Sequence, residues 1–393
     1  MRPDVDLLEP ALHASGRAHE VYASLRQHEP ISWRGAYWAV TRHRDVVEVA
    51  SDWRRFSSAR GTGPRAIDAD PPLRSIHISD PPIHTEMRRI VEASYGHGWL
   101  RALAEPIREE ARARIAAWAE MGTVDAVATL ADPLAFGVLE RLLGQPAPEL
   151  LPILHRFARY DDPRYRQAGE TPEQCFRDAE RLVWDFLRDL VAERAARPRD
   201  DATSRLLASG ALEDRDLMFA LRFIVQTTYQ TTALAIAGGV ATLAAEQAQL
   251  RALPREATPR AADELLRWTS PVIRFARHVT HDTTLAGVPL RAGERVLMFF
   301  ASANRDERVF AAPDRIDLLR APNPHVAFGA GPHACLGAAL ARLQLCAVID
   351  ALRDLDFELV ARPRAFESSV NAGFDRVLVR VDVARAPGSG RSQ

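Results

Sequence analysis

The segment from Phe328 to Gly337 constrains this chain more than any other, because three glycines and a proline surround one cysteine there. Glycine permits backbone conformations that other residues avoid, so we expect an irregular turn. The apolar pattern from Ala338 to Leu352 predicts a helix, which places Cys335 at a helix N-terminus. Unpaired backbone N–H groups and the helix dipole favour a thiolate there. Cys335 is therefore either a ligand for a soft metal or, as free cysteines often are, a small core residue.

A second interpretation of the same segment is a dinucleotide site. Residues 329–334 read Gly-Ala-Gly-Pro-His-Ala and match the Gly-x-Gly-x-x-Gly/Ala fingerprint, with Asp350 downstream. Only about 60 residues follow the match, which is short for a dinucleotide-binding domain. Pro332 also lacks the amide that would otherwise face a phosphate.

The basic residues are all arginine, because Lys and Arg total 51 and no lysine occurs in the sequence. This excludes Schiff-base enzymes, pyridoxal enzymes and Walker-type phosphate loops, each of which needs a lysine amine. With 52 acidic residues the formal charge is -1, so the chain has no strong basic field to attract nucleic acid or an anionic membrane. A small neutral or weakly charged ligand fits this balance better.

The length of 393 residues allows one large domain or two to three smaller ones. Three cysteines, Cys175, Cys335 and Cys346, are too few for a disulfide framework and suit a reducing cytosol. Residues 1–6 are acidic and lack the apolar stretch of a signal peptide. The apolar run 233–245 is shorter than the ~20 residues of a spanning helix. We expect a soluble, cytoplasmic protein without a membrane segment.

Hydrophobic periodicity predicts a mainly α chain with small β-sheet regions. Amphipathic helices are expected over 100–120, 133–143, 173–197 and 212–250. Strands are expected as a hairpin over 31–34 and 37–41, and over 279–285, 288–290 and 295–300. The stretches 56–82 and 160–172 read as loops of the length that often forms a functional lid. The tail 384–393 has the composition of a disordered segment.

The whole cysteine segment resembles the haem-binding loop of the cytochrome P450 family, Phe-Gly-x-Gly-x-His/Arg-x-Cys-x-Gly. Every fixed position is present, including Phe328, Gly329, His333, Cys335 and Gly337. The resemblance implies a cytochrome P450 fold, a single haem-thiolate domain over 1–393, and haem b bound to iron ligand Cys335. It further implies oxidation of a small organic molecule, typical of specialised metabolism, with dioxygen and electrons from a separate ferredoxin and ferredoxin reductase.

Other motifs follow in the order of that family. Glu264 and Arg267 resemble the Glu-x-x-Arg of its K helix, and Arg315 resembles the third member of a buried ion-pair network. An isolated Glu-x-x-Arg is more often a solvated pair on a helix surface. Residues 80–88 resemble the entry of the family's C helix. The resemblance implies that haem propionates are held by His84, Arg88, Arg277, His325 and His333.

The helix expected over 212–250 would cross the distal face of the haem, and it carries a polar run at 226–232. Buried polar groups need partners, so this run predicts a cavity, water or ligand on one side. Thr231 matches the family's threonine, whereas Gln230 stands where an acid is usual and Thr228 where glycine is usual. Gln230 cannot titrate, and Thr228 can bond to the carbonyl four residues earlier.

These departures leave three interpretations. Waters or the substrate can deliver protons, so that ordinary oxygenation proceeds. The reaction can instead be specialised, as oxidative coupling, desaturation, rearrangement or peroxide-driven turnover. A remote alternative is a haem-containing binding or recruitment domain without turnover.

The resemblance also suggests positions that face the substrate pocket. These are Ile78, Thr227, Tyr229, Ile273, Arg274 and Phe374. Arg274 would suit a carboxylate or polar group of the substrate if it points inward, and otherwise faces solvent or a propionate. Tyr229 would orient a substrate hydroxyl or simply pack.

Overall fold

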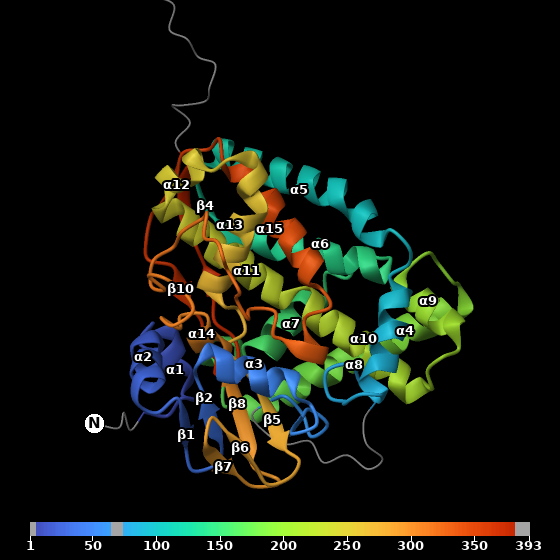
Figure 1. Ribbon diagram of the computed structural model, residues 1–393. Coiled ribbons are helices and arrows are strands. Elements are labelled where there is room, and N and C mark those ends of the chain that lie inside the picture. The colour runs from blue at the N-terminus through green and yellow to red at the C-terminus, as the bar shows by residue number, and fades with distance from the viewer. Residues whose placement is uncertain (1–4, 64–73, 382–393) are drawn as a thin grey trace, which may run out of the picture.

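The computed structural model describes residues 5–63 and 74–381, and Figure 1 shows a body made mainly of helices. The tail 384–393 and part of the loop 56–82 lie outside the described residues. The α-helices are α1 Pro10–Ala14, α2 Ala18–His28, α3 His43–Ser51, α4 Ile83–Ser94, α5 Trp99–Met121, α6 Asp132–Leu143, α7 Leu150–Ala158, α8 Pro172–Ala196, α9 Ala202–Ser209, α10 Asp214–Thr228, α11 Gln230–Ala245, α12 Gln247–Ala252, α13 Thr258–Thr269, α14 Phe300–Ala303 and α15 Ala338–Leu352. Shorter helical turns are η1 Val127–Ala131, η2 Pro163–Tyr165, η3 Arg255–Ala257 and η4 Gly331–His333.

Local sequence explains most helix boundaries. The expected helices over 100–120, 133–143, 173–197 and 338–352 are confirmed within one or two residues. Helix α8 begins where expected because Thr171 caps it in a capping box with Gln174 and Pro172 occupies its first turn.

The single helix expected over 212–250 is wrong, because it is divided into α10, α11 and α12. The first division falls at Tyr229, whose φ of −91° and ψ of −62° lie at the edge of the right-handed helical region. The second falls at Glu246, with φ −112° and ψ 34°. The first break lies inside the polar run, next to Gln230.

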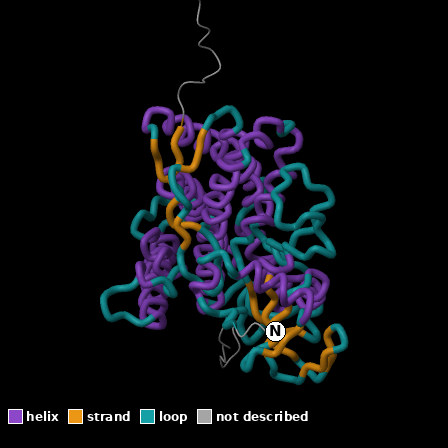
Figure 2. The backbone as a smooth tube through the Cα atoms, turned by 90° about the vertical axis from the view of Figure 1, so that its left-hand side faces the viewer, coloured by secondary structure: helices purple, strands orange, loops and turns teal. Residues whose placement is uncertain are grey.

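Strands lie mostly toward two opposite ends of the helical body (Figure 2). They are β1 Ile31–Trp33, β2 Trp38–Val40, β3 Phe56–Ser57, β4 Thr123–Asp125, β5 Arg274–Val279, β6 Thr283–Leu285, β7 Val288–Leu290, β8 Arg295–Phe299, β9 Phe357–Leu359, β10 Arg364–Ala365, β11 Phe374–Arg376 and β12 Leu378–Val381. The largest sheet has the order β1-β2-β8-β5-β3, with β2 and β8 parallel. Smaller sheets pair β4-β12-β9, β10-β11 and β6-β7.

The expected hairpin over 31–41 is confirmed as the antiparallel pair β1 and β2. The strand expected over 279–285 is wrong: β5 ends at Val279 and β6 begins at Thr283. Strands β6 and β7 join through Ala286 and Gly287, both with positive φ (47° and 85°), as a tight type I′ hairpin turn requires.

The two faces of the five-stranded sheet belong to different cores. Val40, Val296 and Met298 face α3, whereas Ala39, Leu297 and Phe299 on the same strands face α1 and α2. A larger core joins α5, α6, α11, α13 and α15. The cysteine segment leads into α15, while η4 packs against α3, so it connects the helical core with the sheet.

Candidate active site

The cysteine segment is a tight turn held by its own backbone. The N–H of Cys335 donates to the carbonyl of Phe328 (2.9 Å), and the N–H of Ala334 donates to that of Gly331 (3.0 Å). Gly331 has a φ of +69°, and a Cβ there would lie 2.6 Å from Cα of Ser51. Only glycine therefore lets the turn lie directly on the end of α3.

Cys335 is exposed at the surface of the turn, three residues before α15 begins. Although the residue is exposed, the protein atoms packed around its sulfur partly desolvate the thiol and raise its pKa, against the opposing influence of the Gly337 N–H, Arg88 and Arg342. The thiolate expected from the position of Cys335 before a helix stays a prediction for the ligated protein. A metal cation deprotonates a coordinating thiol outright, so ligation would reverse this balance.

Four of the expected anion-binding groups lie together beside this turn. The rings of His84 and His333 are 4.2 Å apart, and His333 Nε2 lies 2.9 Å from Oγ of Ser58. Arg88 donates from Nη1 to the carbonyl of Ala334 at 2.6 Å. Arg277 is buried, and its charge acts on both histidines.

The electrostatics of this cluster favour an anion. Burial, followed by Arg277 and His84, lowers the pKa of His333 to about 2. Burial, followed by Arg88, lowers that of His84, whose two ring nitrogens are buried without a partner. Burial lowers the pKa of Arg277 to about 10 despite nearby Asp80. Two neutral imidazoles and two guanidiniums therefore meet around the turn.

His325 differs from the expectation. Its Nε2 lies 3.3 Å from Oδ1 of Asp263 on α13, and its Nδ1 accepts from the N–H of Ala327. Within residues 5–63 and 74–381, no contact joins His325 to His84, Arg88, Arg277 or His333. Its neighbour Asp263 instead binds Arg342 at 2.6 Å, and Arg342 lies over the ring of Phe328.

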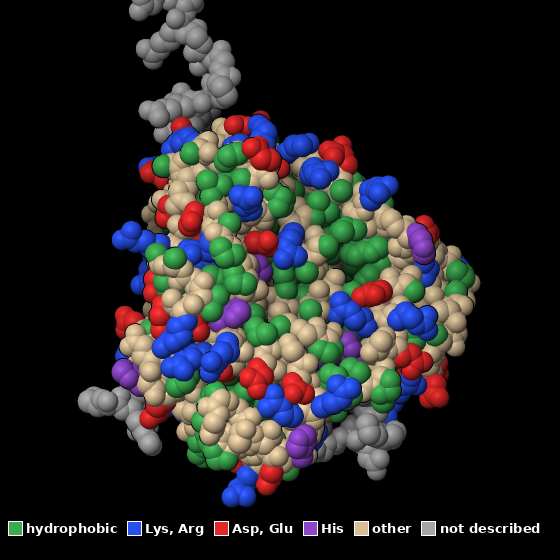
Figure 3. All heavy atoms as spheres, in the orientation of Figure 1, with side chains coloured by type: hydrophobic (Ala, Val, Ile, Leu, Met, Phe, Trp, Pro, Cys, Tyr) green, Lys and Arg blue, Asp and Glu red, His purple; other side chains and the backbone are tan. Residues whose placement is uncertain are grey.

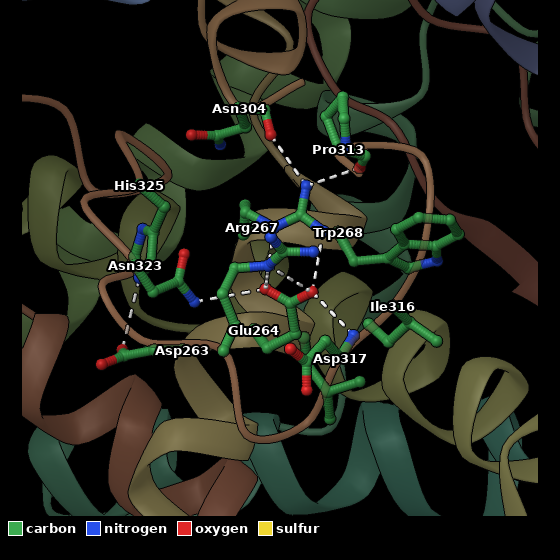
Figure 4. Close-up of polar contacts among 12 residues, drawn as sticks. Asp263, Glu264, Arg267, Trp268, Asn304, Pro313, Ile316, Asp317, Asn323 and His325 are labelled. Atoms are coloured by element: carbon green, nitrogen blue, oxygen red, sulfur yellow. Dashed lines mark hydrogen bonds and ion pairs between the residues drawn. The ribbon is translucent and has the colours of Figure 1, made fainter. Parts of the chain in front are cut away.

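The buried pair of Glu264 and Arg267 is present (Figure 4), but the third member of the network differs from the expected one. Arg267 donates from Nε and Nη2 to Glu264, each at 2.7 Å, and both residues are fully buried. The second arginine on Glu264 is Arg320, whose Nε lies 3.0 Å from Oε2. Arg315 is wrong as the expected partner, because its side chain is exposed and only its carbonyl accepts from Arg267 and Arg320.

The break between α10 and α11 places the polar run in an unusual environment. Thr231 is half-buried in the first turn of α11, and Nε2 of Gln230 is buried without a partner among the residues that the structure describes. The expected bond from Thr228 to a carbonyl four residues earlier is absent from the described hydrogen bonds. Thr227 makes it instead, donating to the carbonyl of Phe223 at 2.8 Å.

The assignment of Tyr229 to the substrate pocket is wrong, because its hydroxyl is bonded to residues on α6 and α7. Its hydroxyl donates to Oδ1 of Asp132 on α6 and lies 2.6 Å from Nε2 of His155 on α7. His155 Nε2 also lies 3.1 Å from Oδ2 of Asp132. Only 1% of Tyr229 is exposed, and its ring packs edge-on against Phe136.

The other expected pocket residues divide into accessible and buried positions. Thr227 is exposed and Phe374 half-buried, whereas Ile78 is buried. Ile273 packs with Tyr22 and Phe299 in the core beside α1 and α2, so its assignment to the pocket is wrong. Arg274 is fully buried, and within the described residues its side chain donates one hydrogen bond, to Oγ of Ser369 (3.2 Å).

Comparisons with known proteins agree with this geometry. Residues 246–367 match the family model for Cytochrome P450. Linalool 8-monooxygenase from Pseudomonas putida is 31% identical, over 95% of this chain and 98% of that protein. The chain belongs to the cytochrome P450 family. A Mycobacterium marinum cytochrome P450 in complex with pseudoionone superposes with a TM-score of 0.87 at 30% identity, covering 96% of this chain and 98% of that one.

A second similar structure is that of the P450 OxyD, which is involved in the biosynthesis of vancomycin-type antibiotics. It superposes with a TM-score of 0.84 at 28% identity, over 96% of this chain and 99% of that one. The expected cytochrome P450 fold is therefore confirmed. The chain is a P450 monooxygenase, a haem-iron oxidoreductase that acts on a small molecule with redox partners. Among the described helices of this P450, none is both long and apolar enough to cross a membrane.

The residues of this P450 fit a haem. A haem needs a metal ligand and donors for two carboxylates, and the turn presents an exposed sulfur beside the four-residue cluster. Buried polar atoms normally have partners, so the two orphan nitrogens of His84 mark a place for an acceptor. Gly337 leaves the space next to the sulfur open, because a Cβ at that position would lie 3.9 Å from Sγ of Cys335.

The face of the P450 that carries α4, α5 and α15 is seen in Figure 3. Arginine and acidic side chains alternate on it around an apolar area, and neither sign forms a continuous field.

Sequence reasoning missed Arg320, Asp132 and His155. Nothing in their local sequence distinguishes them from surface or capping residues, because their partners lie far away along the chain.

Proposed function

We propose that this P450 binds haem b through Cys335 and oxidises a small organic molecule of specialised metabolism. Dioxygen is the oxidant, and a separate ferredoxin and ferredoxin reductase supply electrons. Thiolate-ligated haem supplies the activation of dioxygen. The observation that carries the proposal is the Phe328–Gly337 turn, which holds an exposed Cys335 beside a basic cluster in which both ring nitrogens of His84 lack a partner among the described residues.

In this proposal the four clustered residues hold the haem propionates. His84, Arg88, Arg277 and His333 approach from α4, β5 and the turn itself, so separate segments fix one anion position. Charged donors make stronger hydrogen bonds to carboxylates than neutral ones. Phe328, Gly329 and Gly337 shape the turn around Cys335. We leave His325 outside this clamp because it pairs with Asp263.

On the distal side, we assign proton handling to Thr231 and Gln230. A threonine hydroxyl can donate and accept at once, whereas the Gln230 amide can orient a water but cannot release a proton. The orphan Nε2 of Gln230 supports this role, because it lacks a protein acceptor. Thr228 is the last residue of α10 and stands where the family usually has glycine. The hydroxyl bond to a carbonyl four residues earlier, expected of Thr228, is made by Thr227 to Phe223 instead.

Relatives support the substrate class. The similarity to OxyD favours specialised metabolism, and the similarity to linalool 8-monooxygenase favours a small apolar molecule. Electron transfer needs a docked partner, and without lysine every basic contact on this protein comes from arginine. The guanidinium stays charged throughout the physiological pH range, so we expect docking to vary little with pH.

The Gln230 substitution favours one further candidate, an atypical oxidation such as coupling, desaturation or rearrangement. The two candidates are separated by supplying the holoprotein with ferredoxin, its reductase and ¹⁸O₂, with linalool as the probe. Incorporation of one labelled oxygen indicates monooxygenation, and an oxidised product without label indicates the atypical reaction. A ferrous dioxygen-exposed state that decays without product from linalool or a wider metabolite panel contradicts both and favours a recruitment domain.

The role of the distal residues is tested by Gln230→Glu and Thr231→Ala. We expect Gln230→Glu to raise the fraction of electrons recovered in product and Thr231→Ala to lower it about 10-fold, which is less than the ~10²–10⁴-fold contribution of a general acid or base because water can deliver part of the protons. If neither variant changes that fraction, residues 230 and 231 are not a proton route.

A further inference from the structure

Tyr95 and Trp99 form an aromatic pair where α4 leads into α5. Their ring centroids are 4.6 Å apart and the ring planes are tilted by 34°, so the two π systems are in contact. Tyr95 is only 8% exposed, whereas Trp99, the first residue of α5, is half-buried and partly open to solvent. The pair therefore connects the interior of the protein with its surface.

Tyr95 lies beside the cysteine turn. It caps the C-terminus of α4 with helical backbone angles (φ −71°, ψ −20°), seven residues after Arg88, and residues seven apart share one face of a helix. Arg88 on that face donates to the carbonyl of Ala334 at 2.6 Å, next to Cys335. Leu336, on the other side of Cys335, belongs to the same apolar cluster as Tyr95.

The electrostatics of Tyr95 indicate the same proximity. Burial raises the pKa of its phenol, and the charge of Cys335 is the next cause, with a larger effect than that of Glu92 on the preceding turn of α4. Coulomb energies fall with distance, so the sulfur lies close to the phenol. Two aromatic rings in contact thus lead from the side of Cys335 to the surface at Trp99.

The phenol of Tyr95 does not act as a structural tie. Within residues 5–63 and 74–381 it makes no hydrogen bond, whereas the buried phenol of Tyr229 bonds to Asp132 and His155. Buried phenols usually have such a partner. Without a described acceptor for its proton, an oxidised Tyr95 is a poor place for a radical and draws an electron from Trp99. The indole of Trp99 can give its N–H proton to water, because this residue is partly exposed.

We propose that Tyr95 and Trp99 form a one-electron route from the surface to the haem, and that Trp99 is a second reaction site, where small water-soluble reductants are oxidised. This activity goes beyond the proposed oxygenation but rests on haem binding at Cys335. With hydrogen peroxide as oxidant, the peroxide takes up two electrons and two protons and becomes two waters. Each electron passes from Trp99 through Tyr95, and one reductant molecule, losing one electron, restores Trp99.

The test uses the full haem-loaded protein without substrate, mixed with hydrogen peroxide and frozen for electron paramagnetic resonance. We expect a tryptophan radical, recognised by the change of its spectrum when the tryptophan rings are deuterated. Trp99→Phe should remove this radical, and Trp99→Tyr should replace it with a tyrosine radical. Tyr95→Phe should lower its yield, because a phenyl ring is harder to oxidise than a phenol.

Trp33 supplies a matched control. It is 47% exposed on β1 and also contacts a second ring, that of Trp38 at 5.3 Å. No hydrogen bond or ring contact in the described part of the chain joins Trp33 to the cysteine turn. Trp33→Phe should therefore leave the radical unchanged.

Ferrocyanide is the probe reductant for the second measurement, because its high negative charge keeps it out of an apolar pocket. Peroxide-dependent formation of ferricyanide then reports oxidation at the surface. We expect its rate to fall about 10-fold or more in Trp99→Phe, which corresponds to a barrier higher by about 1.4 kcal/mol, and to stay unchanged in Trp33→Phe.

A radical that is absent from the wild-type protein or survives in Trp99→Phe overturns the proposal, as does a ferricyanide rate that falls equally in Trp33→Phe. The thiolate band of the ferrous–carbon monoxide complex is recorded first for every variant. If Trp99→Phe lacks this band, the conversion or survival of the tryptophan signal in Trp99→Tyr decides. Loss of the band in the wild-type protein overturns the proposed function together with this route, whereas an intact band without a radical at Trp99 overturns the route alone.

Discussion

The phenol of Tyr229 donates a 2.6 Å hydrogen bond to Oδ1 of Asp132, a residue 97 positions earlier in the chain. Burial disfavours the Asp132 anion, but the bonds with His155 and Tyr229 outweigh it and lower the pKa of the carboxyl. The break between α10 and α11 is therefore tied to an ionised carboxylate on another helix. The usual distal acid is absent at Gln230, yet a carboxylate still fixes the backbone beside it.

Replacement of Tyr229 by Phe removes that tie while keeping the ring against Phe136. A hydrogen bond to a charged group contributes about 1.5–3 kcal/mol, so we expect a loss of that size in the free energy of unfolding. Urea unfolding followed by circular dichroism measures it. The break should also loosen next to Thr231, raising the hydrogen peroxide released per electron consumed. An unchanged free energy and unchanged peroxide release would show that the tie has no role.

Gly331 and Gly329 form a matched pair in the cysteine turn. Both have left-handed backbones, with φ of 69° and 68°. An added Cβ would lie 2.6 Å from Cα of Ser51 at position 331, but in ordinary contact, 3.9 Å from the carbonyl oxygen of His333, at position 329. Gly329→Ala should cost about 1–2 kcal/mol from backbone strain alone. Gly331→Ala should cost about 1–3 kcal/mol more from overpacking. Equal losses in urea unfolding would mean that the turn does not rest on α3 as described.

The observed ion-pair network contains Arg320 where the expected one contains Arg315, and substitution of each residue tests which of them stabilises the fold. Arg320→Met removes a buried donor to Glu264, and we expect a loss of about 2–3 kcal/mol, less than for a fully unpaired charge because Arg267 remains. Arg315→Met changes an exposed side chain and should leave the free energy of unfolding unchanged. The reverse ranking would restore Arg315 as the third member.

Buried neutral histidines predict how stability depends on pH. Burial, followed by Arg305 and Arg26, lowers the pKa of His19 to about 3. Below its ordinary value of about 6.5 the unfolded chain binds a proton that the folded protein does not, so folding stability falls as pH falls. The slope from this one group approaches about 1.4 kcal/mol per pH unit below pH 5.5.

His19→Gln should remove that share of the slope. Unfolding free energies at pH 7, 6 and 5 measure it for both proteins. If the two proteins lose stability in parallel over this range, His19 does not remain neutral in the folded state.

Local patterns were sufficient to predict the parts of the site that depend on neighbours in sequence. The Phe328–Gly337 turn and the helix Ala338–Leu352 follow from glycine placement and apolar periodicity. The buried pair of Glu264 and Arg267 was implied only by the family resemblance, because i,i+3 spacing alone is more typical of a solvated pair. The break at Tyr229 could not be predicted in this way. Its cause is a pair of hydrogen-bond partners on α6 and α7, and tertiary contacts override helix propensity there.

The sequence also could not predict which side chains of an irregular segment point inward. Arg315 and Arg320 occupy the same polar stretch, and only the three-dimensional course of that stretch directs one inward and leaves the other exposed. The same limit applies to His325, whose partner Asp263 is 62 residues away. Arg274 was recognised as a candidate for a carboxylate, but its burial and its two unsatisfied nitrogens are visible only in the structure.

The central claim is that Cys335 holds the haem iron as a thiolate. The most direct test is the absorption spectrum of the ferrous–carbon monoxide complex, which reports whether the ligand opposite carbon monoxide is a thiolate. We predict the thiolate band in the wild-type protein and in the controls Cys175→Ser and Cys346→Ser, and its loss in Cys335→Ser. Persistence of the band in Cys335→Ser, or its absence from the haem-loaded wild-type protein, would contradict the assignment.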